Sequence, residues 1–240
     1  MRVLLFNLVL LFFAGRVCFA QETLKIEKAS REYDVVIQVQ ACGGKEQRDD
    51  SNTCSGPARV SLYKKHAESP FQVLHLPNIE LYKDTAAFNP QTSEKPRGIY
   101  AEEYSVVFDD FNFDGKQDLA ICNGRGGGYG SPSYNVYLFN KRLHKFIANR
   151  RLSRLTEDVY LGLFFPDAKK KLLIAFWKSG CCYHETEKYR VVNNRPVLIE
   201  RIIEDATVGN GKFAKVTTRR LINGKWVTRV TREKINTDEP

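Results

Sequence analysis

The sequence of 240 residues predicts an all-β fold with a propeller-like arrangement of small antiparallel sheets. Three observations lead to this prediction. Short segments rich in β-branched and aromatic residues, several of them alternating apolar with polar positions, are typical of strands. No long segment has convincing helical periodicity. A unit of strand, glycine- or cysteine-rich loop and second strand occurs three times along the chain.

The predicted strands begin with the β-branched residues 35–39 and continue with residues 58–63, which alternate partly. Residues 134–139 have the same character. Residues 172–177 form an almost continuous apolar run, which suits a buried strand.

A hairpin is predicted near the end of the chain, over residues 213–232. Two strand-like segments there, residues 217–222 and 226–231, flank Asn223 and Gly224. The Asn-Gly pair tolerates the positive φ angles that a tight turn between antiparallel strands requires.

The repeated units cover residues 35–76, 106–155 and 163–203. Units of about 40–50 residues suit a propeller-like fold, in which small sheets pack face to face. The alternative is a β-sandwich with three similar hairpins. We expect residues 21–240 to form one domain, with the proline-containing residues 77–97 as a connection after the first unit.

The first 20 residues are predicted to be a signal peptide. A charged start precedes an apolar run of a length too short to span a bilayer, and small residues precede the expected cleavage after Ala20. We therefore expect an exported, periplasmic protein without a membrane span. Lipid attachment at Cys18 is an alternative, although Arg16 and Val17 fit a lipid-attachment box poorly.

Export permits disulfides. Cys42 and Cys54 bracket a polar loop, and we expect them to be joined. Cys122, Cys181 and Cys182 form an odd set, so one pair and one free thiol are expected, with the pairing left open.

Basic residues exceed acidic residues by 37 to 28. The excess is compatible with an acidic partner surface, and the lysines at 169–171 are either part of such a contact or a solvated turn. No basic helical stripe or nucleic-acid module is visible, so a nucleic-acid partner is not expected.

The most specific motif is an acidic loop at residues 110–118. Oxygen-bearing side chains recur at alternate positions, a glycine stands at the sixth, and Ca²⁺ prefers several oxygen ligands at once. The candidate ligands are Asp110, Asn112, Asp114, the backbone carbonyl of Lys116, and Asp118 directly or through water. Position 12, which is a glutamate in a helix–loop–helix calcium site, is Ile121, so the loop is expected between strands. Mg²⁺ suits the motif less well, and an acidic turn without metal is the alternative.

The acidic loop resembles the loops of FG-GAP repeats in integrin-type propellers. Residues 108–139, together with Ser179 to His184 and Tyr189, are similar to a family of periplasmic, calcium-binding, propeller-like immunity proteins. That family neutralises lysozyme-like peptidoglycan hydrolases delivered by antibacterial type IV secretion systems. The resemblance extends over roughly residues 108–204 and implies an immunity role with a secreted lysozyme-like hydrolase as partner.

A glycine-rich loop follows the strand that leaves the acidic loop, at residues 125–134. Glycines allow close backbone approach, and tyrosine is a frequent interface anchor. We expect this loop to enter the hydrolase cleft, with calcium holding its base; a mobile surface turn is the alternative. The candidate contact residues are Arg125, Tyr129, Ser131 and Tyr134, with Tyr183 and His184 as a second contact loop.

An enzyme is not expected. The four histidines have no recognisable catalytic spacing, and no nucleophile elbow, phosphate-binding loop or HExxH motif is present. A hydrolase with paired carboxylates stays open, because three acids lie near the metal loop: Glu102, Glu103 and Asp109. The alternative to an inhibitor is a calcium-dependent envelope adhesion or glycan-binding module.

Overall fold

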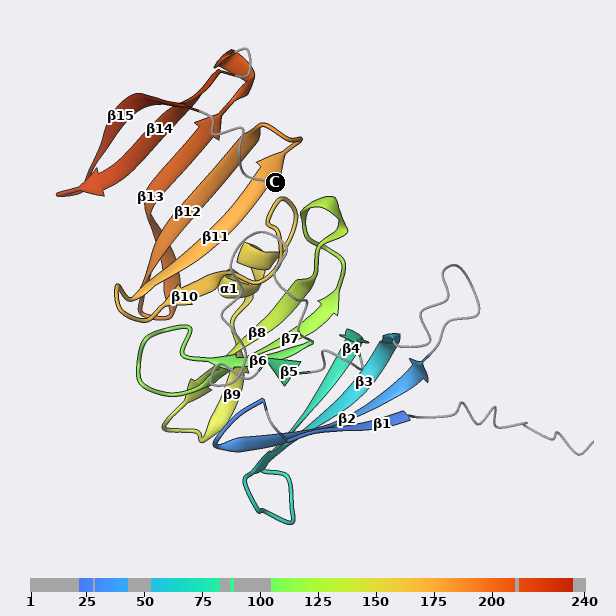
Figure 1. The fold of residues 1–240 in the computed structure, drawn as a ribbon. Helices are drawn as coiled ribbons and strands as arrows, with labels where there is room; N and C mark the ends of the chain where they lie inside the picture. The colour runs from blue at the N-terminus through green and yellow to red at the C-terminus, as the bar shows by residue number, and fades with distance from the viewer. Residues whose placement is uncertain are drawn as a thin grey trace, which may run out of the picture.

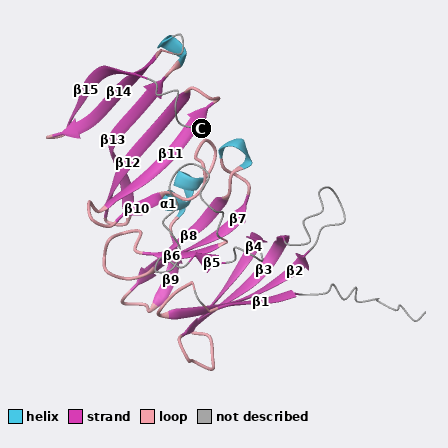
Figure 2. Ribbon diagram, in the orientation of Figure 1, coloured by secondary structure: helices cyan, strands magenta, loops and turns pink. Residues whose placement is uncertain are grey.

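The structure is a computed structural model that describes residues 22–27, 29–42, 53–82, 87–88, 105–209 and 212–234. It confirms the predicted all-β class: strands dominate, and they form three small antiparallel sheets that follow one another in chain order (Figures 1 and 2). The predicted signal peptide, Glu102 and Glu103 lie outside the described residues. Among the described helices, none is long and apolar enough to cross a membrane.

The first sheet is a four-stranded antiparallel meander in the order β1-β2-β3-β4. Its strands are β1 (Glu22–Ile26), β2 (Tyr33–Cys42), β3 (Thr53–Lys64) and β4 (Gln72–Tyr82). A disulfide joins Cys42 to Cys54, which are direct partners across β2 and β3.

The middle sheet has the order β5-β6-β7-β8-β9. All its pairs are antiparallel except β5 with β6. Its strands are β5 (Ala87–Phe88), β6 (Val106–Asp109), β7 (Asp118–Gly124), β8 (Ser133–Asn140) and β9 (Lys145–Ala148). The one short α-helix among the described residues, α1 (Arg150–Ser153), follows β9 and is capped by Asn149, which accepts a hydrogen bond from Leu152 N.

The third sheet is a six-stranded meander, β10 to β15. Asn223 and Gly224 both have positive φ, 49° and 76°, as their tight turn requires. The strands are β10 (Phe165–Asp167), β11 (Leu172–Ser179), β12 (Tyr183–Val192), β13 (Arg195–Asp205), β14 (Phe213–Ile222) and β15 (Lys225–Lys234). Short 3₁₀ turns complete the described part: η1 (Gly128–Gly130), η2 (Arg154–Thr156) and η3 (Thr207–Gly209).

The middle sheet buries both of its faces, which explains the continuous apolar run of β7. Leu119 and Ile121 pack in a cluster with the first sheet, and Ala120 and Cys122 pack in a second cluster with α1 and the third sheet. The strands of each weak sequence repeat lie within one sheet, and the first and third sheets extend beyond their repeats by β1 and by β14 and β15. The two ends of β7 lead into two loops, and these loops together form the candidate site (Figure 1).

Candidate functional site

The acidic loop, residues 110–117, connects β6 to β7 and takes its shape from side chains that accept backbone hydrogen bonds. The Asp110 carboxylate accepts from Asp114 N at 3.0 Å and Gly115 N at 2.7 Å, and Asp114 Oδ1 accepts from Lys116 N at 2.9 Å. Phe113 and Gly115 have positive φ, 60° and 84°, so the chain reverses sharply there. These bonds reproduce the tight turn that the motif predicted.

Asp118, the last acid of the motif, is fully buried at the start of β7. Its Oδ2 accepts from Phe111 N at 2.9 Å and Asn112 N at 3.3 Å, and its Oδ1 accepts from Phe139 N at 2.8 Å. Burial raises the pKa of Asp118 to about 7; the bonds from Phe139 and Phe111 oppose the rise, and the nearby carboxylates add to it. Asp118 therefore fastens the acidic loop to β8.

The donor set of the acidic loop fits a hard cation, because it offers carboxylate and amide oxygens and no soft ligand. Among the described residues, however, the carboxylates of this loop do not form a group of three whose ligand atoms lie within 4.8 Å of one another. Lys141 Nζ lies 3.5 Å from Asp114 Oδ1 and donates to Asp114 O at 2.7 Å. Calcium would hold Asp110, Asn112 and Asp114 in place of these contacts.

The acidic loop also contacts the third sheet. Asn112 Nδ2 donates to Asn194 Oδ1 at 3.0 Å in the turn between β12 and β13, and Asn149 Nδ2 donates to Asn194 O at 2.8 Å. The acidic loop thus joins two sheets at one end of β7.

The glycine loop, residues 125–132, lies at the other end of β7. Because β7 has seven residues, about 20 Å of strand separates the two loops. The expectation that calcium holds the base of the glycine loop is therefore wrong: any support from calcium must pass through the middle sheet.

Backbone contacts hold the glycine loop against residues 158–162. Gly128 N donates to Tyr160 O at 2.8 Å, and Asp158 N donates to Gly126 O at 2.8 Å. A Cβ on Gly127 would lie 2.4 Å from Ser131 Oγ, and one on Gly128 would lie 2.5 Å from Val159 O. The glycines are needed for close packing, not for mobility.

Tyr129 projects from this packed loop, with 69% of its surface exposed. Its φ is 55°, a left-handed conformation that is uncommon for a tyrosine. The Tyr129 hydroxyl accepts a hydrogen bond from Gly180 N at 2.6 Å, and Lys178 Nζ lies 5.5 Å from the ring centroid. Lys178, which sequence reasoning missed, adds a cation beside the exposed ring.

Gly180 belongs to the turn between β11 and β12, where Cys181 and Cys182 form a disulfide with each other. Cys122 is buried and takes no part in either disulfide, which resolves the pairing that the sequence left open. Ala206 N donates to Cys182 O at 2.8 Å. The disulfide turn is thus tied to the third sheet and lies directly beside Tyr129.

A buried polar network supports the glycine loop from beneath, and sequence reasoning missed it. The Tyr160 hydroxyl donates to Glu187 Oε2 at 2.7 Å and lies 2.9 Å from the Tyr189 hydroxyl, which also bonds Glu187. Burial raises the pKa of Glu187, but the bonds from Tyr189, Tyr160 and Arg201 outweigh burial and hold the pKa below its usual range. Tyr160, whose ring these bonds hold in place, is also the residue whose backbone carbonyl accepts the hydrogen bond from Gly128 N.

Glu185 neighbours this network and differs from Glu187 in its pKa. Burial raises the pKa of Glu185, and Arg201 offsets this in part. Arg201 Nε lies 2.7 Å from Glu185 Oε1, but this contact lacks hydrogen-bond geometry, and Oε1 has no hydrogen-bond partner among the described residues. The contact is therefore an ion pair.

The predicted contact residues fall into different environments. Arg125 forms an ion pair with Glu80 at 2.9 Å and donates to Gly130 O at 3.3 Å, so it braces the glycine loop. Ser131 Oγ donates to Tyr160 O and accepts from Gly162 N, both at 3.1 Å, and has the same role. Tyr134 is 3% exposed in the core beneath the middle sheet, so the expectation that it contacts a partner is corrected.

Tyr183 and His184 follow the disulfide turn and point to opposite faces of β12, because successive side chains alternate. Tyr183 packs on Trp177 with ring centroids 5.5 Å apart. His184 packs on Phe176 at 5.8 Å, and its Nδ1 lies 4.0 Å from Glu204 Oε2. Both are half-buried, so at most part of each ring reaches the surface beside Tyr129.

The fold and loops define a class of protein: three stacked antiparallel sheets with an acidic turn and a packed, tyrosine-bearing glycine loop at opposite ends of one strand. No protein-family model matches the sequence. No curated protein matches it either. A solved structure described as that of "a Xanthomonas Type IV Secretion System related protein" is similar, with a TM-score of 0.68 and 24% identity, over 89% of this chain and 94% of that chain. At this identity the likeness establishes a shared fold.

Proposed function

We propose that this protein is an exported, calcium-binding inhibitor of a lysozyme-like peptidoglycan hydrolase, with an immunity role in the periplasm. The observation that carries the proposal is the geometry of Tyr129, an exposed aromatic side chain on a loop whose backbone is packed too closely to rearrange freely. A preorganised anchor of this kind loses little conformational freedom on binding.

The surroundings of Tyr129 suit the cleft of a glycoside hydrolase. Such clefts hold a pair of catalytic carboxylates. Lys178, beside the Tyr129 ring, supplies a positive charge that complements these acids. Arg125 forms an ion pair with Glu80 and supports the loop. Tyr129 would fill the cleft, and the disulfide turn would contact its rim.

The context of the structural neighbour supports the same proposal. That protein is described as related to a type IV secretion system, and the resemblance in residues 108–139 points to immunity proteins of such systems. The two disulfides of the described residues are compatible with an oxidising compartment. Calcium at the acidic loop would stabilise the middle sheet, from one end of which Tyr129 projects.

The test is hydrolysis of peptidoglycan by a panel of lysozyme-type enzymes, with the mature protein added at increasing ratio in calcium. We expect stoichiometric inhibition of at least one enzyme. Absence of inhibition across the panel, with calcium binding and specific binding to cells or glycans, would replace the inhibitor by an envelope adhesion module.

A pair of variants locates the contact. Tyr129→Ala removes the anchor and is expected to weaken inhibition by about 30-fold or more, the effect typical of an interface hot spot. Leu143→Ala, on the exposed turn between β8 and β9, is the matched control and should leave inhibition unchanged. Affinity of Tyr129→Ala within about twofold of the native protein would show that the glycine loop is not the anchor.

A further inference from the structure

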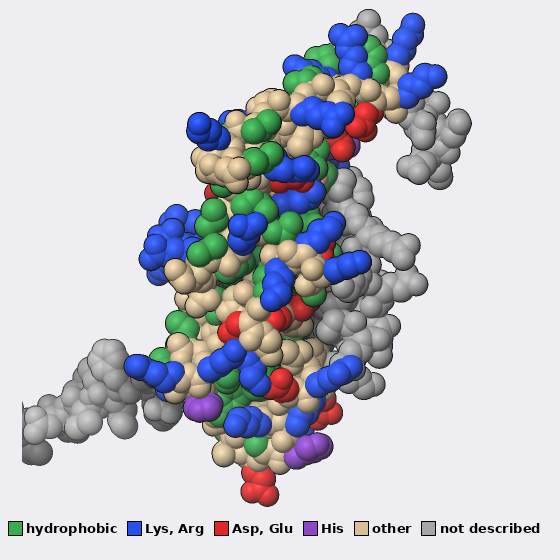
Figure 3. All heavy atoms as spheres, turned by 90° about the vertical axis from the view of Figure 1, so that its left-hand side faces the viewer, with side chains coloured by type: hydrophobic (Ala, Val, Ile, Leu, Met, Phe, Trp, Pro, Cys, Tyr) green, Lys and Arg blue, Asp and Glu red, His purple; other side chains and the backbone are tan. Residues whose placement is uncertain are grey.

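The positive charge of this protein is concentrated in the C-terminal hairpin, residues 212–234. This segment contains eight basic residues and one acid, Glu233, whereas the whole sequence has 37 basic and 28 acidic residues. Most of the net charge of +9 therefore lies on β14 and β15. In Figure 3, lysine and arginine side chains with hydrophobic groups between them cover the upper part of the face shown, at the height of the third sheet in Figure 1.

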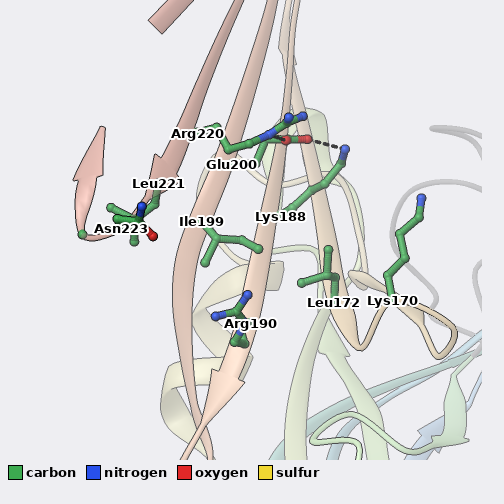
Figure 4. A pocket seen from close by; sticks show the side chains of 10 residues that line it. Lys170, Leu172, Lys188, Arg190, Ile199, Glu200, Arg220, Leu221 and Asn223 are labelled. Atoms are coloured by element: carbon green, nitrogen blue, oxygen red, sulfur yellow. Dashed lines mark hydrogen bonds and ion pairs between the residues drawn. The ribbon is translucent and has the colours of Figure 1, made fainter. Parts of the chain in front are cut away.

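A groove of about 630 Å³ lies where this hairpin meets β12 and β13. Its basic residues are Lys170, Lys188, Arg190 and Arg220, and apolar side chains lie between them (Figure 4). The apolar residues are Leu172, Ile199 and Leu221. The groove thus combines cations with an apolar floor.

The charges in this region are only partly neutralised within the described chain. Glu200, which is 6% exposed, pairs with both Lys188 and Arg220, and Lys170 lies 3.6 Å from Asp167. No described residue forms an ion pair with Arg190, or with the hairpin cations Lys225 and Arg229. The described residues therefore leave these three cations open to an external anion.

The hairpin also exposes apolar side chains among its cations. These are Ile222 (46% exposed), Trp226 (40%), Val227 (50%) and Val230 (54%). Because successive side chains alternate, Ile222 and Val227 share a face with Lys225 and Arg229, whereas Trp226 lies on the opposite face with Arg219. Apolar side chains among long basic ones are typical of surfaces that lie at a membrane interface, where apolar groups meet lipid and cations meet phosphate.

We propose that the C-terminal hairpin and its groove form a second binding surface, which docks on the phosphate headgroups of an anionic lipid membrane. A second copy of the chain is disfavoured as occupant, because pairing β15 with itself would bring like charges together. Phosphates bind Arg190, Lys225 and Arg229, and Ile222 and Val227, which share the face of Lys225 and Arg229, enter the interface.

The docking surface and Tyr129 lie at opposite ends of the third sheet. The groove includes Asn223 and Gly224 of the β14–β15 turn, whereas Tyr129 contacts Gly180 of the β11–β12 turn. In this antiparallel meander these two turns are at opposite ends of the strands. The protein can therefore bind a membrane with one end while Tyr129 stays accessible at the other.

The test is flotation of the mature, calcium-loaded protein with vesicles of phosphatidylcholine alone or mixed with phosphatidylglycerol. We expect binding to the mixed vesicles only, and loss of binding at 1 M salt, where charges are screened beyond about 3 Å. The double variant Lys225→Ser/Arg229→Ser should weaken partitioning roughly 25-fold, since each cation near an anionic surface contributes about fivefold. Val227→Ser should weaken it further without changing the dependence on salt.

Arg59→Ser, on the exposed face of β3 in the first sheet, is the matched control for loss of a cation and should bind vesicles normally. Equal binding to neutral vesicles, or an equal loss with Arg59→Ser, would overturn the proposal. Absence of vesicle binding together with salt-sensitive binding to polyglutamate would replace the lipid with an acidic protein. The hairpin variants should still inhibit the hydrolase, so the proposal of membrane binding and the proposal of inhibition can be contradicted independently.

Discussion

The two loops at the ends of β7 keep their shapes by different means. In the acidic loop, side-chain carboxylates accept the backbone N–H groups that a sharp reversal leaves unpaired. In the glycine loop, backbone groups bond to a neighbouring segment, and the absence of side chains permits the close approach. The first loop is therefore sensitive to charge and metal, and the second to volume.

The largest effect is expected from the acid that is buried. Asp118→Ala leaves three buried backbone N–H groups without their acceptor, and in metal-free buffer it should lower the free energy of unfolding by about 4 kcal/mol. The comparison variant is Asp110→Ala, whose exposed N–H partners can turn to water, with an expected loss of about 1 kcal/mol. Denaturant unfolding measures both; similar losses would contradict the structural role of Asp118.

The next largest effect is expected from calcium, which should act on the acidic loop. At a free concentration 100-fold above its Kd, calcium bound to the acidic loop should stabilise the protein by about 2.7 kcal/mol, and chelation should remove this. Asp114→Ala should abolish the increment, whereas Glu68→Ala, an exposed acid of the first sheet, should keep it. Calorimetric titration and thermal unfolding are the measurements. A melting temperature that does not respond to chelation would count against calcium.

The sequence predicted those features that depend on local pattern. Strand alternation indicated the all-β class, and the strands of each repeat lie within one sheet. The Asn223–Gly224 turn depends on backbone preferences that two adjacent residues determine. The reversal of the acidic loop also follows from short-range spacing.

Features that depend on distant residues were missed or misjudged. Tyr134 is both the last residue of the predicted glycine-rich loop and the first residue of the predicted strand 134–139. Its burial depends on Leu152 and Leu155, which the sequence does not place beside it. The network of Tyr160 with Glu187 joins residues 27 positions apart. The sequence did carry one indication of this network. Glu187 and Tyr189 are two positions apart and therefore share a face of β12, so a buried tyrosine implies a buried acid beside it.

The volume sensitivity of the glycine loop can be tested with two alanines. Gly127→Ala places a Cβ 2.7 Å from Tyr160 O and should cost about 2 kcal/mol of stability and displace Tyr129 from its inhibiting position. Gly130→Ala meets no atom within 4 Å and has the strain of a positive φ, 70°, alone, about 1 kcal/mol. Inhibition assays and unfolding measure both effects. If Gly127→Ala inhibits normally, the packing of this loop does not position Tyr129.

The smallest effect concerns pH and the network beneath the glycine loop. The pKa of Glu187 is lower in the folded protein than in the unfolded chain, so its contribution to stability is complete above the usual pKa of a glutamate and is lost as the pH falls through the folded value. Protonation removes the negative charge of the acceptor and so weakens the hydrogen bonds from Tyr160 and Arg201, a loss of about 1 kcal/mol.

Glu187→Gln should remove this component of the pH dependence, which unfolding at a series of acidic pH values measures against the native protein. Tyr160→Phe keeps the carbonyl that anchors Gly128 but deletes the hydroxyl that bonds Glu187. If the network positions the loop, Tyr160→Phe should speed dissociation of the hydrolase more than it lowers the melting temperature. Equal dissociation rates in Tyr160→Phe and native protein would mean that main-chain packing alone positions Tyr129. The glycine loop would then depend on main-chain packing only, and the acidic loop on side-chain carboxylates.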